Sequence, residues 1–468
     1  MSAARDCDVV VIGGGLSGLA TAFALTRRGV AVEVLEAAPR AGGVIASRQR
    51  DGALFETGPN SAVDHSPQIG ELLAALGIAS ERIATNPRSA TRYIVRDGKL
   101  MPLPMSPPAV IASRTFSLAA KLRLLREPYI APAPEDADES VAAFVLRRLG
   151  REFLDYAVDP FVAGVYAGDP ERLSLPAAFP RLSALEQRYG SLIRGQLKAA
   201  RVRTDASGPA PSRASFSFRR GMQTLTDALA RAIPSVSTGV AVERVVRELS
   251  GTFVVSARRD GESIERRARA VVLAVPADAA AMLLGELAPG AAQALAAIEY
   301  APVATIATVY RRADIGHPLD GFGCLVPKRE RRQFLGTLFS SSLFDGRAPP
   351  GCVLLTSFLG GMRQPELPAK SDAVLEQVLQ AEHAMLLGAR AAPVWSEITR
   401  WPRAIPQYTL GHRARLAELD VAERELPGLY LRANYRGGIS VGDCVIAASA
   451  TADSVAEYIG KEKPARME

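Results

Sequence analysis

The sequence predicts an α/β protein in which a parallel sheet, assembled from separate parts of the chain, is accompanied by an antiparallel sheet and a helical insertion. Three observations predict this fold class. Residues 8–36 read as strand, glycine-rich turn, helix and strand, whereas residues 101–213 read as mostly helical. Strand patterns return between residues 300 and 413, which is typical of a second sheet.

The composition is that of an ordinary globular protein and excludes several classes. The 468 residues correspond to about three average domains, and 48% are apolar and 22% charged. The four cysteines form no Cys-x-x-Cys pair and the four histidines are scattered, so we expect neither a disulfide scaffold nor a metal site. No uncharged apolar run is long enough to span a membrane, and the stretch before the first strand is too short for a secretory signal. We therefore expect a cytoplasmic protein.

The N-terminal element is a βαβ unit. The apolar, β-branched run over residues 8–12 predicts a strand buried on both faces. A helical pattern from Leu19 to Arg28 ends at Gly29, and residues 30–35 predict a second strand. This order of elements opens a Rossmann-like domain.

The turn between the first strand and the helix carries the motif Gly13-x-Gly15-x-x-Gly18, and Glu36 ends the second strand. Glycines permit a tight turn and a close approach of the backbone to a pyrophosphate, while the helix N-terminus offers free N–H groups and a positive dipole. An acid at the end of the second strand accepts a hydrogen bond from a ribose hydroxyl. The pattern therefore predicts a dinucleotide site.

The residues after Glu36 indicate which dinucleotide is bound. Arg40, Gly42 and Gly43 complete the pattern Glu-x-x-x-Arg-x-Gly-Gly, which resembles the FAD-binding amine oxidase superfamily. The glycine pair lets the backbone pass close to a ligand, and Arg40 can neutralise a phosphate. No second Gly-x-Gly-x-x-Gly follows a strand, so oxygen is the expected electron acceptor. We expect Cys444 to be a buried small side chain and FAD to be bound non-covalently.

Later segments are assigned to the same domain. Residues 240–246 and 270–276 predict sheet strands, and residues 429–431 predict a short one. A turn over residues 437–442 leads into a predicted helix over residues 444–459, whose N-terminus would stabilise negative charge on a reduced flavin. The alternative is that this helix only closes the core.

The helical insertion begins with the proline-rich residues 101–108. The next segment, residues 109–130, predicts an amphipathic helix in which Leu118, Leu122 and Leu125 recur at helical spacing. Such a basic, amphipathic helix either lies on an acidic membrane surface or is an ordinary solvated helix. The pattern leaves both alternatives open.

Basic residues also accumulate toward the end of the insertion, within a chain of net charge +7. Between residues 181 and 213, seven Lys or Arg stand against two acids. This excess fits an anionic membrane surface or an acidic substrate, and because no nucleic-acid motif accompanies it we expect no nucleic-acid partner. Residues 202–215 are expected to form a mobile loop. The basic side chains of the insertion include Arg114, Lys121, Arg123, Arg126, Arg181, Arg188, Arg194, Lys198, Arg201, Arg203 and Arg213.

A second sheet is predicted by strand patterns at residues 303–310, 334–340 and 352–358. We expect it to be antiparallel and to enclose the substrate. The predicted division is then an FAD-binding domain over residues 1–85, 214–295 and 412–468, a substrate-binding domain over residues 86–100 and 296–411, and a helical, membrane-associating domain over residues 101–213.

Longer strings, found in order along nearly the whole chain, resemble the protoporphyrinogen oxidase family of FAD enzymes. The most specific are Gly164-Val-Tyr-Ala-Gly-Asp-Pro170 and Ile405-Pro-Gln-Tyr408. The resemblance implies the six-electron oxidation of protoporphyrinogen IX to protoporphyrin IX in haem biosynthesis, with oxygen reduced to hydrogen peroxide. It also implies a homodimer attached peripherally to the inner face of the cell membrane. Further strings begin at Gly58, Gly321, Leu335, Trp401 and Asn434.

The resemblance implies roles for single residues. Arg92 would hold a propionate of the substrate, which suits the fork of a guanidinium group, and Asn60 would lie between flavin and substrate. Leu335 and Phe344 would sandwich a pyrrole ring, and Gly164 and Val165 would line the opening. The implied FAD contacts are Gly13, Gly14, Gly15, Leu16, Ser17, Gly18, Glu36, Arg40, Gly42, Gly43, Gly58, Pro59, Asn60, Ser61, Val242, Trp401, Ile439, Ser440 and Val441.

The chemistry requires little from the protein beyond binding. A bridging carbon of the electron-rich porphyrinogen can lose hydride to the flavin while solvent or Asn60 assists loss of the pyrrole proton. The protein therefore has to bind the substrate, orient it and exclude competing reactions. Three alternatives remain. A coproporphyrinogen III oxidase would need additional basic side chains, for which Arg96, Lys99 and Arg432 are candidates, because its substrate has four propionates. An amine oxidase or polyene desaturase would lack the string at Gly164, and a non-catalytic flavoprotein is the most remote alternative.

Overall fold

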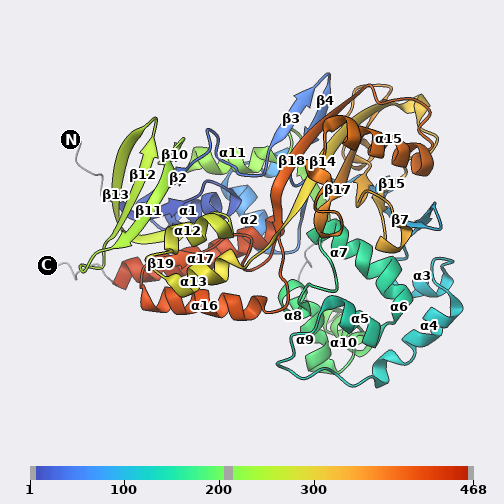
Figure 1. The fold of residues 1–468 in the computed structure, drawn as a ribbon, viewed down its shortest axis with the longest axis horizontal. Coiled ribbons are helices and arrows are strands. Elements are labelled where there is room, and N and C mark those ends of the chain that lie inside the picture. Colours follow the sequence, from blue (N-terminus) through green and yellow to red (C-terminus); the bar gives the residue numbers. More distant parts are fainter. Residues whose placement is uncertain (1–6, 205–213, 462–468) are drawn as a thin grey trace.

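The computed structural model describes residues 7–204 and 214–461. Two seven-stranded sheets organise the molecule, each with its own helices, and the helical insertion lies beneath the second sheet (Figure 1). The α/β class predicted from the sequence is confirmed. The predicted domain boundaries stay a prediction, and of the loop predicted over residues 202–215, residues 205–213 lie outside the described residues.

The first sheet is parallel at its centre. Its strand order is β10-β2-β1-β13-β12-β11, with β19 pairing beside β13. The strands β10, β2, β1, β13 and β19 are parallel to one another, whereas β11, β12 and the first half of β13 form an antiparallel meander. The bounds are β1 (Cys7–Ile12), β2 (Val32–Glu36), β10 (Val236–Thr238), β11 (Ala241–Arg247), β12 (Phe253–Arg259), β13 (Glu262–Leu273) and β19 (Leu429–Leu431).

Helices cover both faces of this sheet, and each layer buries a separate hydrophobic core. The apolar runs predicted to be buried strands lie between these layers, as a sheet covered on both faces requires. One face is covered by α1 (Leu16–Arg27), α2 (Pro67–Ala75), α11 (Gln223–Ala232) and α17 (Val441–Lys461), and the other by α12 (Ala277–Leu284), α13 (Pro289–Ala296) and α16 (His412–Glu425).

Several element bounds differ from the predicted ones, among them those of α1, α17 and β13. Helix α1 begins at Leu16 rather than Leu19, and α17 begins at Val441, which the sequence assigned to the preceding turn. Strand β13 begins at Glu262 instead of Ala270, because its charge-rich first half pairs with β12, a strand that was not predicted. For β13, pairing with β12 extends a strand pattern that is weak in the local sequence.

The second sheet has the order β18-β14-β17-β16-β15-β7-β8. It is antiparallel except where β15 and β7 run parallel, and the strands predicted at residues 303–310, 334–340 and 352–358 pair antiparallel as expected. The strand predicted over residues 334–340 is shorter, because Ser340 already begins helix α14 (Ser340–Leu343). The bounds are β7 (Thr91–Arg96), β8 (Lys99–Pro102), β14 (Tyr300–Arg311), β15 (Gly321–Leu325), β16 (Gly336–Leu338), β17 (Cys352–Gly360) and β18 (Trp395–Pro406), with α15 (Asp372–Leu387) packed on one face.

Smaller elements connect these layers. Two short sheets consist of β3 (Ser47–Arg50) with β4 (Ala53–Glu56), and of β5 (Ala62–Val63), β9 (Ser215–Phe218) and β6 (Arg82–Ala84). Single 3₁₀ turns occur at residues 79–81, 87–89, 127–129, 312–314, 328–330, 361–363 and 367–369.

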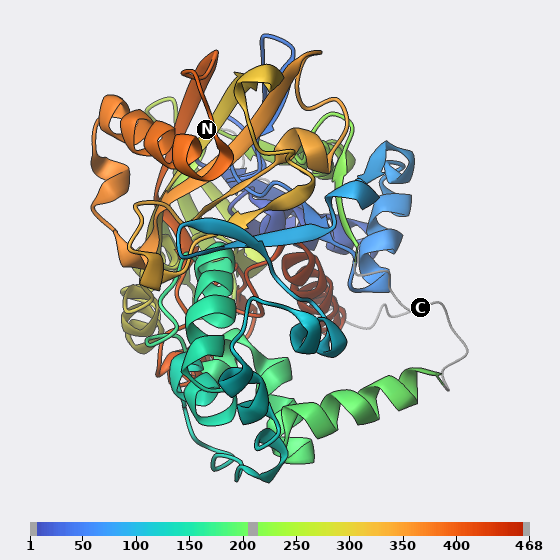
Figure 2. The same cartoon turned by 90° about the vertical axis from the view of Figure 1, so that its right-hand side faces the viewer.

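The insertion is helical, as predicted, but its helices are short. The bounds are α3 (Pro107–Ala112), α4 (Leu118–Leu124), α5 (Val141–Arg148), α6 (Arg151–Phe153), a π-helical turn (Leu154–Val158), α7 (Asp159–Tyr166), α8 (Leu175–Ala178), α9 (Pro180–Tyr189) and α10 (Leu192–Thr204), and α10 extends along one edge of the molecule (Figure 2).

The single amphipathic helix predicted over residues 109–130 was wrong. The chain leaves the helical conformation after α3, and the Ser117 hydroxyl then caps α4 by accepting a hydrogen bond from the Ala120 N–H group. Lys121 donates to the carbonyl oxygens of Ile111 and Ser113, so its charge stabilises the end of α3 instead of facing outward.

The interior of the insertion contains a buried ion-pair network. Arg148 is fully buried and pairs with Glu127 and Glu186, which are also buried. Glu127 accepts hydrogen bonds from the Leu192 and Ile193 N–H groups and so caps α10. Glu186 therefore does not offset the basic surface that the sequence predicts, because its charge is neutralised inside.

Candidate active site at the carboxyl edge of the parallel sheet

Two helices direct their N-termini to the same edge of the parallel sheet. Helices α1 and α17 pack side by side over a shared hydrophobic core (Figure 1). The Ser17 hydroxyl hydrogen-bonds the Cys444 thiol near the start of both helices, and Arg28 beyond the end of α1 pairs with Asp453 farther along α17. The helices are therefore parallel, and their positive ends lie together beyond the end of β1. Burial raises the pKa of the Cys444 thiol to about 11, so this thiol stays protonated.

The glycine motif forms a cradle at this edge. Gly13 has φ +105°, and a Cβ there would lie 2.7 Å from the Ala274 carbonyl oxygen. A Cβ on Gly18 would lie 1.9 Å from the Gly13 carbonyl oxygen, so neither position accepts a side chain. At Gly15, in contrast, a Cβ would meet no heavy atom of the described part of the chain within 4 Å, apart from its chain neighbours. This space in front of the α1 N-terminus is where a pyrophosphate fits.

The Glu36 carboxylate lies beside the cradle. One oxygen accepts a hydrogen bond from the Gly14 N–H group at 2.6 Å, and the other accepts one from Ala38 at 2.7 Å. The Glu36 carbonyl oxygen accepts from the Val240 N–H group, which brings the start of β11 next to it. Between Val242 and Arg244 the pairing of β11 with β12 shifts register, which marks a β-bulge next to Val242. Glu36 and Val242, two of the predicted FAD contacts, are thus neighbours in space.

The Arg40 side chain contacts backbone oxygens of the glycine turn. Its guanidinium group donates to the carbonyl oxygens of Ala41, Gly43 and Ile45 at 2.8–3.0 Å. A Cβ on Gly42 would lie 2.5 Å from the Arg40 Nη1 atom. Arg40 therefore shapes the glycine turn from within, and its expected role at a phosphate stays a prediction.

The loop from Gly58 to Ser61 reaches the same edge. The Trp401 indole donates a hydrogen bond to the Thr57 carbonyl oxygen at 2.7 Å, which ties β18 to this loop. A Cβ on Gly58 would lie 2.1 Å from the Val44 carbonyl oxygen, so the loop passes directly over the turn that follows Gly43. The Asn60 amide is held by a hydrogen bond to the Gly58 carbonyl oxygen at 3.2 Å. Tertiary packing thus brings together the predicted contacts at residues 42–43, 58–61 and 401.

The turn before α17 is fixed by its own side chains. Ser440 accepts a hydrogen bond from the Asp443 N–H group at 3.1 Å and donates one to the Asp443 carboxylate at 2.6 Å. Ser440 is therefore the N-cap of α17, and its hydroxyl is used for capping rather than left free for a cofactor. His65 lies 3.3 Å from the other Asp443 oxygen. The N–H groups of Val441 and Gly442, in the first turn of α17, are left without intrahelical partners.

Arg92, the predicted substrate anchor, lies on β7. Its guanidinium carbon sits 5.0 Å from the centre of the Phe322 ring, and among the described residues its side chain has no hydrogen bond or ion pair. Alternation along the strand places Arg92 on the same face as Ile94, which packs into the core of the helical insertion. An exposed, unpaired guanidinium group resting on an aromatic ring is available to a carboxylate.

The predicted apolar contacts lie in different surroundings. Phe344 lines a small cavity of about 10 Å³ together with Asn60, whereas Leu335 packs in a cluster that includes Ala163 of α7. Both Phe344 and Leu335 are buried. On α7, Val165 is 39% exposed, while a Cβ on Gly164 would lie 2.6 Å from the Leu325 side chain. Gly164 thus permits α7 to approach β15 closely.

One buried pair beside Phe344 was missed by the sequence analysis. Arg347 and Glu56 are both at most 4% exposed, and their charged groups are 3.5 Å apart. Burial raises the pKa of the Glu56 carboxyl group, against the opposing hydrogen bond from Ser47 and the charge of Arg347. The Arg347 guanidinium also bonds the Ser217 hydroxyl, so it joins β9 to the second sheet. No motif marks these residues, because their partners are far away in the sequence.

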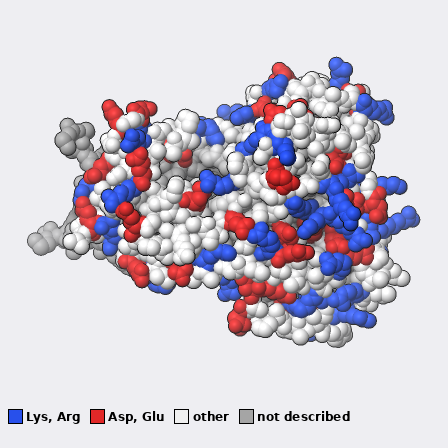
Figure 3. Space-filling view, viewed as in Figure 1, with Lys and Arg blue, Asp and Glu red and all other residues white. Residues whose placement is uncertain are grey.

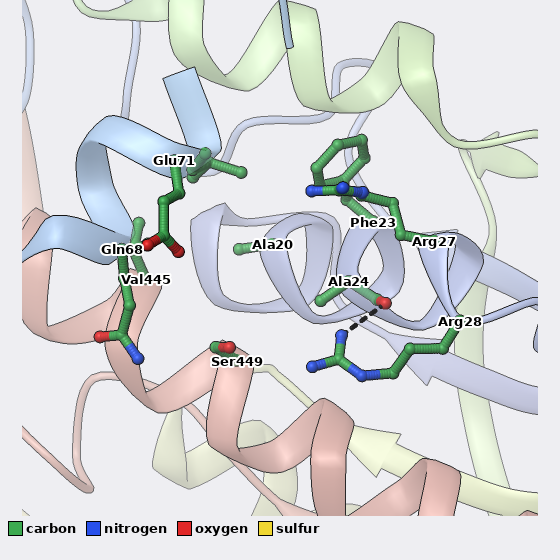
Figure 4. A pocket seen from close by; sticks show the side chains of 10 residues that line it. Ala20, Phe23, Ala24, Arg27, Arg28, Gln68, Glu71, Val445 and Ser449 are labelled. Carbon is green, nitrogen blue, oxygen red and sulfur yellow. Dashed lines mark hydrogen bonds between the residues drawn. The ribbon is translucent and has the colours of Figure 1, made fainter. Parts of the chain in front are cut away.

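A surface pocket of about 340 Å³ lies along the flank of α1, with α2 and α17 as its other walls (Figure 4). Ala20 and Ala24 form its floor, and Arg27 and Glu71 stand at its rim. Within residues 7–204 and 214–461 no group of three or more His, Cys, Asp or Glu is arranged to hold a metal ion.

The cradle fits a flavin dinucleotide. Two parallel helix N-termini, an open space beside Gly15 and an acid at the end of β2 provide for a pyrophosphate and a ribose. The loop of Asn60 and the start of α17 border the same edge and would hold the flavin ring. These are the residue types and the arrangement that FAD requires.

Comparison with known proteins agrees with this geometry. Residues 16–456 match the family model described as flavin containing amine oxidoreductase. The fold resembles a crystal structure from Exiguobacterium sp. 255-15 with a TM-score of 0.81 at 23% identity, covering 97% of this chain and 99% of the other. The chain belongs to the flavin containing amine oxidoreductase family; it is an FAD-dependent oxidoreductase, and its cofactor is FAD.

Within this family the chain is homologous to porphyrinogen oxidases. It is 34% identical to the mitochondrial protoporphyrinogen oxidase of Nicotiana tabacum, over 96% of this chain and 95% of the tobacco one. It is 27% identical to the coproporphyrinogen III oxidase of Bacillus subtilis (strain 168), over 96% of this chain and 98% of the other. The resemblance to the protoporphyrinogen oxidase family, inferred from the sequence strings, is confirmed.

Two alanine variants separate the cofactor role of the cradle from its structural role. Gly15→Ala should fold with an unchanged melting temperature, because the added Cβ enters open space, but its affinity for FAD should fall about tenfold or more. Gly18→Ala should lower the melting temperature of the apoprotein itself, because its Cβ overlaps the Gly13 carbonyl oxygen. Thermal unfolding of apoprotein and titration with FAD measure the two effects. Normal FAD affinity in Gly15→Ala would place the pyrophosphate elsewhere.

Proposed function

We propose that the protein oxidises protoporphyrinogen IX to protoporphyrin IX with oxygen as the electron acceptor. The observation that carries this proposal is homology to protoporphyrinogen oxidases along 96% of the chain. Six hydrogen atoms leave the porphyrinogen, and three oxygen molecules take them up as three molecules of hydrogen peroxide. FAD supplies the hydride acceptor and passes each electron pair to oxygen.

The protein contributes binding and orientation to this reaction. Arg92 is proposed to grip one propionate, because its guanidinium group is unpaired and rests on Phe322. Asn60 and Phe344 border the same small cavity, and we propose that they lie beside a pyrrole ring of the substrate. Leu335 and Val165 are proposed to complete the apolar wall from the side of α7.

The competing substrate, coproporphyrinogen III, is less well supported by the cations of the chain. Its four propionates call for more basic groups, yet Arg96 is paired with Glu152 at 2.8 Å. Arg432 donates to the Thr451 hydroxyl between β19 and α17, on the side of the first sheet. Lys99 stands exposed on the hairpin of β7 and β8. Two of the three candidate cations are therefore engaged elsewhere, which favours the substrate with two propionates.

Turnover of the two porphyrinogens, compared side by side, tests the proposed function. We expect kcat/KM for protoporphyrinogen IX to exceed that for coproporphyrinogen III by at least about tenfold, measured as the rise of porphyrin fluorescence. Equal kcat/KM values, or a higher value for coproporphyrinogen III, would assign coproporphyrinogen III as the substrate. Flavin that stays oxidised with both porphyrinogens in the absence of oxygen would contradict an oxidase function altogether.

Arg92 variants test the propionate contact. Arg92→Ala should raise the KM for protoporphyrinogen IX about tenfold through loss of a charge-assisted hydrogen bond, with FAD content unchanged. Arg92→Lys should raise KM less, because it keeps the charge but loses the fork. Steady-state kinetics of both variants provide the measurement. An equal effect of Ala and Lys on KM would argue against a carboxylate partner.

We further propose that the insertion attaches the enzyme peripherally to the inner face of the cell membrane. Leu118, Leu122 and Leu125 are 55–72% exposed along α4, and Tyr129 is 84% exposed just beyond it. No described helix is both long and apolar enough to cross a membrane. An exposed apolar face of this kind supports shallow insertion into a lipid surface.

Charges around this face support the same role. Arg126, Arg188, Arg194 and Lys198 are exposed, and Lys and Arg side chains gather over the insertion and the adjoining sheet in Figure 3. Arg123, in contrast, donates to the carbonyl oxygens at the end of α5 and does not contribute to the surface. The predicted basic residues Arg201, Arg203 and Arg213 lie outside the residues whose side chains are described.

Removal of the α4 leucines tests membrane attachment. The triple variant Leu118→Ser, Leu122→Ser, Leu125→Ser should bind anionic vesicles at least about tenfold more weakly, because these three exposed apolar side chains no longer enter the lipid. Leu249→Ser is the matched control, since Leu249 is fully exposed on the turn between β11 and β12. Vesicle co-sedimentation with unchanged flavin content gives the result. Equal binding of the triple variant and the control would reject this surface.

We propose in addition that the protein is a homodimer, as the resemblance to its family implies. Light scattering of the purified holoenzyme gives the molecular mass directly. A mass equal to that of one chain at micromolar concentration would overturn this part of the proposal.

A further inference from the structure

Tyr408 lies where three parts of the molecule meet. It follows the last residue of β18 by two positions and is 3% exposed. Its backbone oxygen accepts a hydrogen bond from the Ser174 N–H group of the insertion at 2.8 Å. Its side chain reaches the segment that precedes α17, in the layer of the first sheet. The second sheet, the insertion and the cofactor cradle thus share this residue.

The hydroxyl group of Tyr408 makes two hydrogen bonds in this segment. It donates to the Asn434 carbonyl oxygen at 2.6 Å and accepts from the Gly438 N–H group at 3.2 Å. Burial raises the pKa of this phenol well above its ordinary value, so the group remains a donor at every working pH. The Tyr408 hydroxyl oxygen is therefore hydrogen-bonded to both ends of the segment from Asn434 to Gly438.

The ring of Tyr408 is held from two sides. The His412 ring stacks on it with centroids 4.2 Å apart and planes 12° apart, and the Tyr166 ring meets it edge-on at 5.8 Å. His412 is itself held by a hydrogen bond from its Nε2 atom to the Tyr435 carbonyl oxygen at 2.9 Å. With the ring clamped in this way, the position of the hydroxyl oxygen is determined by packing.

The turn that this hydroxyl holds has little freedom of its own. Gly437 and Gly438 have φ +88° and +117°, which only glycine adopts readily. A Cβ on Gly438 would lie 2.6 Å from the Asp443 side chain, so the turn packs directly on the first turn of α17. A displacement of Gly438 would consequently move Ser440, the N-cap, and with it the start of the helix.

We propose that Tyr408 is a positioning residue for the cofactor, whose hydroxyl group holds the Gly437–Gly438 turn and thereby aims the N-terminus of α17 at the flavin. The positive end of a helix favours negative charge within its first turn, and this effect falls off steeply with distance. A change in the position of α17 therefore alters both the affinity for FAD and the ease with which the bound flavin accepts electrons.

The substitution Tyr408→Phe tests this proposal because it removes the two hydrogen bonds and keeps the stacked ring. We expect the dissociation constant of FAD to rise about tenfold, the reduction potential of the bound flavin to become more negative, and its visible absorption bands to shift. With protoporphyrinogen IX, kcat should fall and KM should stay unchanged. The FAD measurements need no substrate, so they stand even if the proposed function fails.

Tyr166→Phe is the matched control. It also removes one buried phenol and keeps the ring, but that hydroxyl donates to the Ala178 carbonyl oxygen inside the insertion at 3.0 Å and not to the turn. We expect its FAD affinity and flavin spectrum to match those of the unmodified protein. If Tyr408→Phe and Tyr166→Phe change FAD affinity, potential and spectrum alike, or if neither changes them, the proposal is overturned.

Two further measurements decide the case if Tyr408→Phe does not fold. Gly438→Ala disturbs the same turn from the side of Asp443 and should also weaken FAD binding and shift the flavin spectrum. In the unmodified holoenzyme, the Gly438 amide should exchange with deuterium slowly, because the Tyr408 oxygen protects it. Rapid exchange of this amide, or a normal flavin spectrum in Gly438→Ala, would overturn the proposal.

Discussion

The parallel packing of α1 and α17 is the constraint on which the rest of the site depends. These helices come from opposite ends of the chain, yet contacts from Ser17–Cys444 to Arg28–Asp453 align them in the same direction. Both positive ends therefore meet at one edge of the parallel sheet, where unpaired N–H groups favour an anionic ligand. Every other cofactor element, from Glu36 to the loop of Asn60, is arranged around that edge.

The second constraint is the way the remaining layers are attached to this edge. Strand β18 reaches the Gly58 loop through the Trp401 indole and the α17 turn through Tyr408. In β7, Ile94 packs into the core of the insertion and Val95 into the core beneath α15, so the strand joins two cores and also carries the exposed Arg92. The second sheet therefore carries both Arg92, the proposed substrate anchor, and Trp401, which contacts the loop at the cofactor edge.

The insertion shows where local patterns mislead. The spacing of Leu118, Leu122 and Leu125 correctly indicated an apolar helical face, and that face is exposed. The basic residues among them were expected to face a surface, but Lys121 and Arg123 bind carbonyl oxygens within the insertion. The local sequence does not reveal whether a charged side chain contacts lipid, solvent or the carbonyl groups at a helix end. Only the position of the neighbouring carbonyl groups decides among these partners.

The sequence by itself determined the fold class, the cofactor and the family, because close backbone approach to a pyrophosphate demands glycines at a fixed spacing after a strand. The Gly13-x-Gly15-x-x-Gly18 turn and Glu36 follow from local chemistry alone, whereas the C-terminal helix was predicted from residue 444 and begins at Val441. Only the tertiary structure decided that Ser440 caps a helix, that Arg40 binds backbone, and that Tyr408 and the Arg347–Glu56 pair border the cofactor and substrate residues. Their roles depend on partners in other parts of the chain, and a burial environment made by distant segments leaves no periodicity in the local sequence.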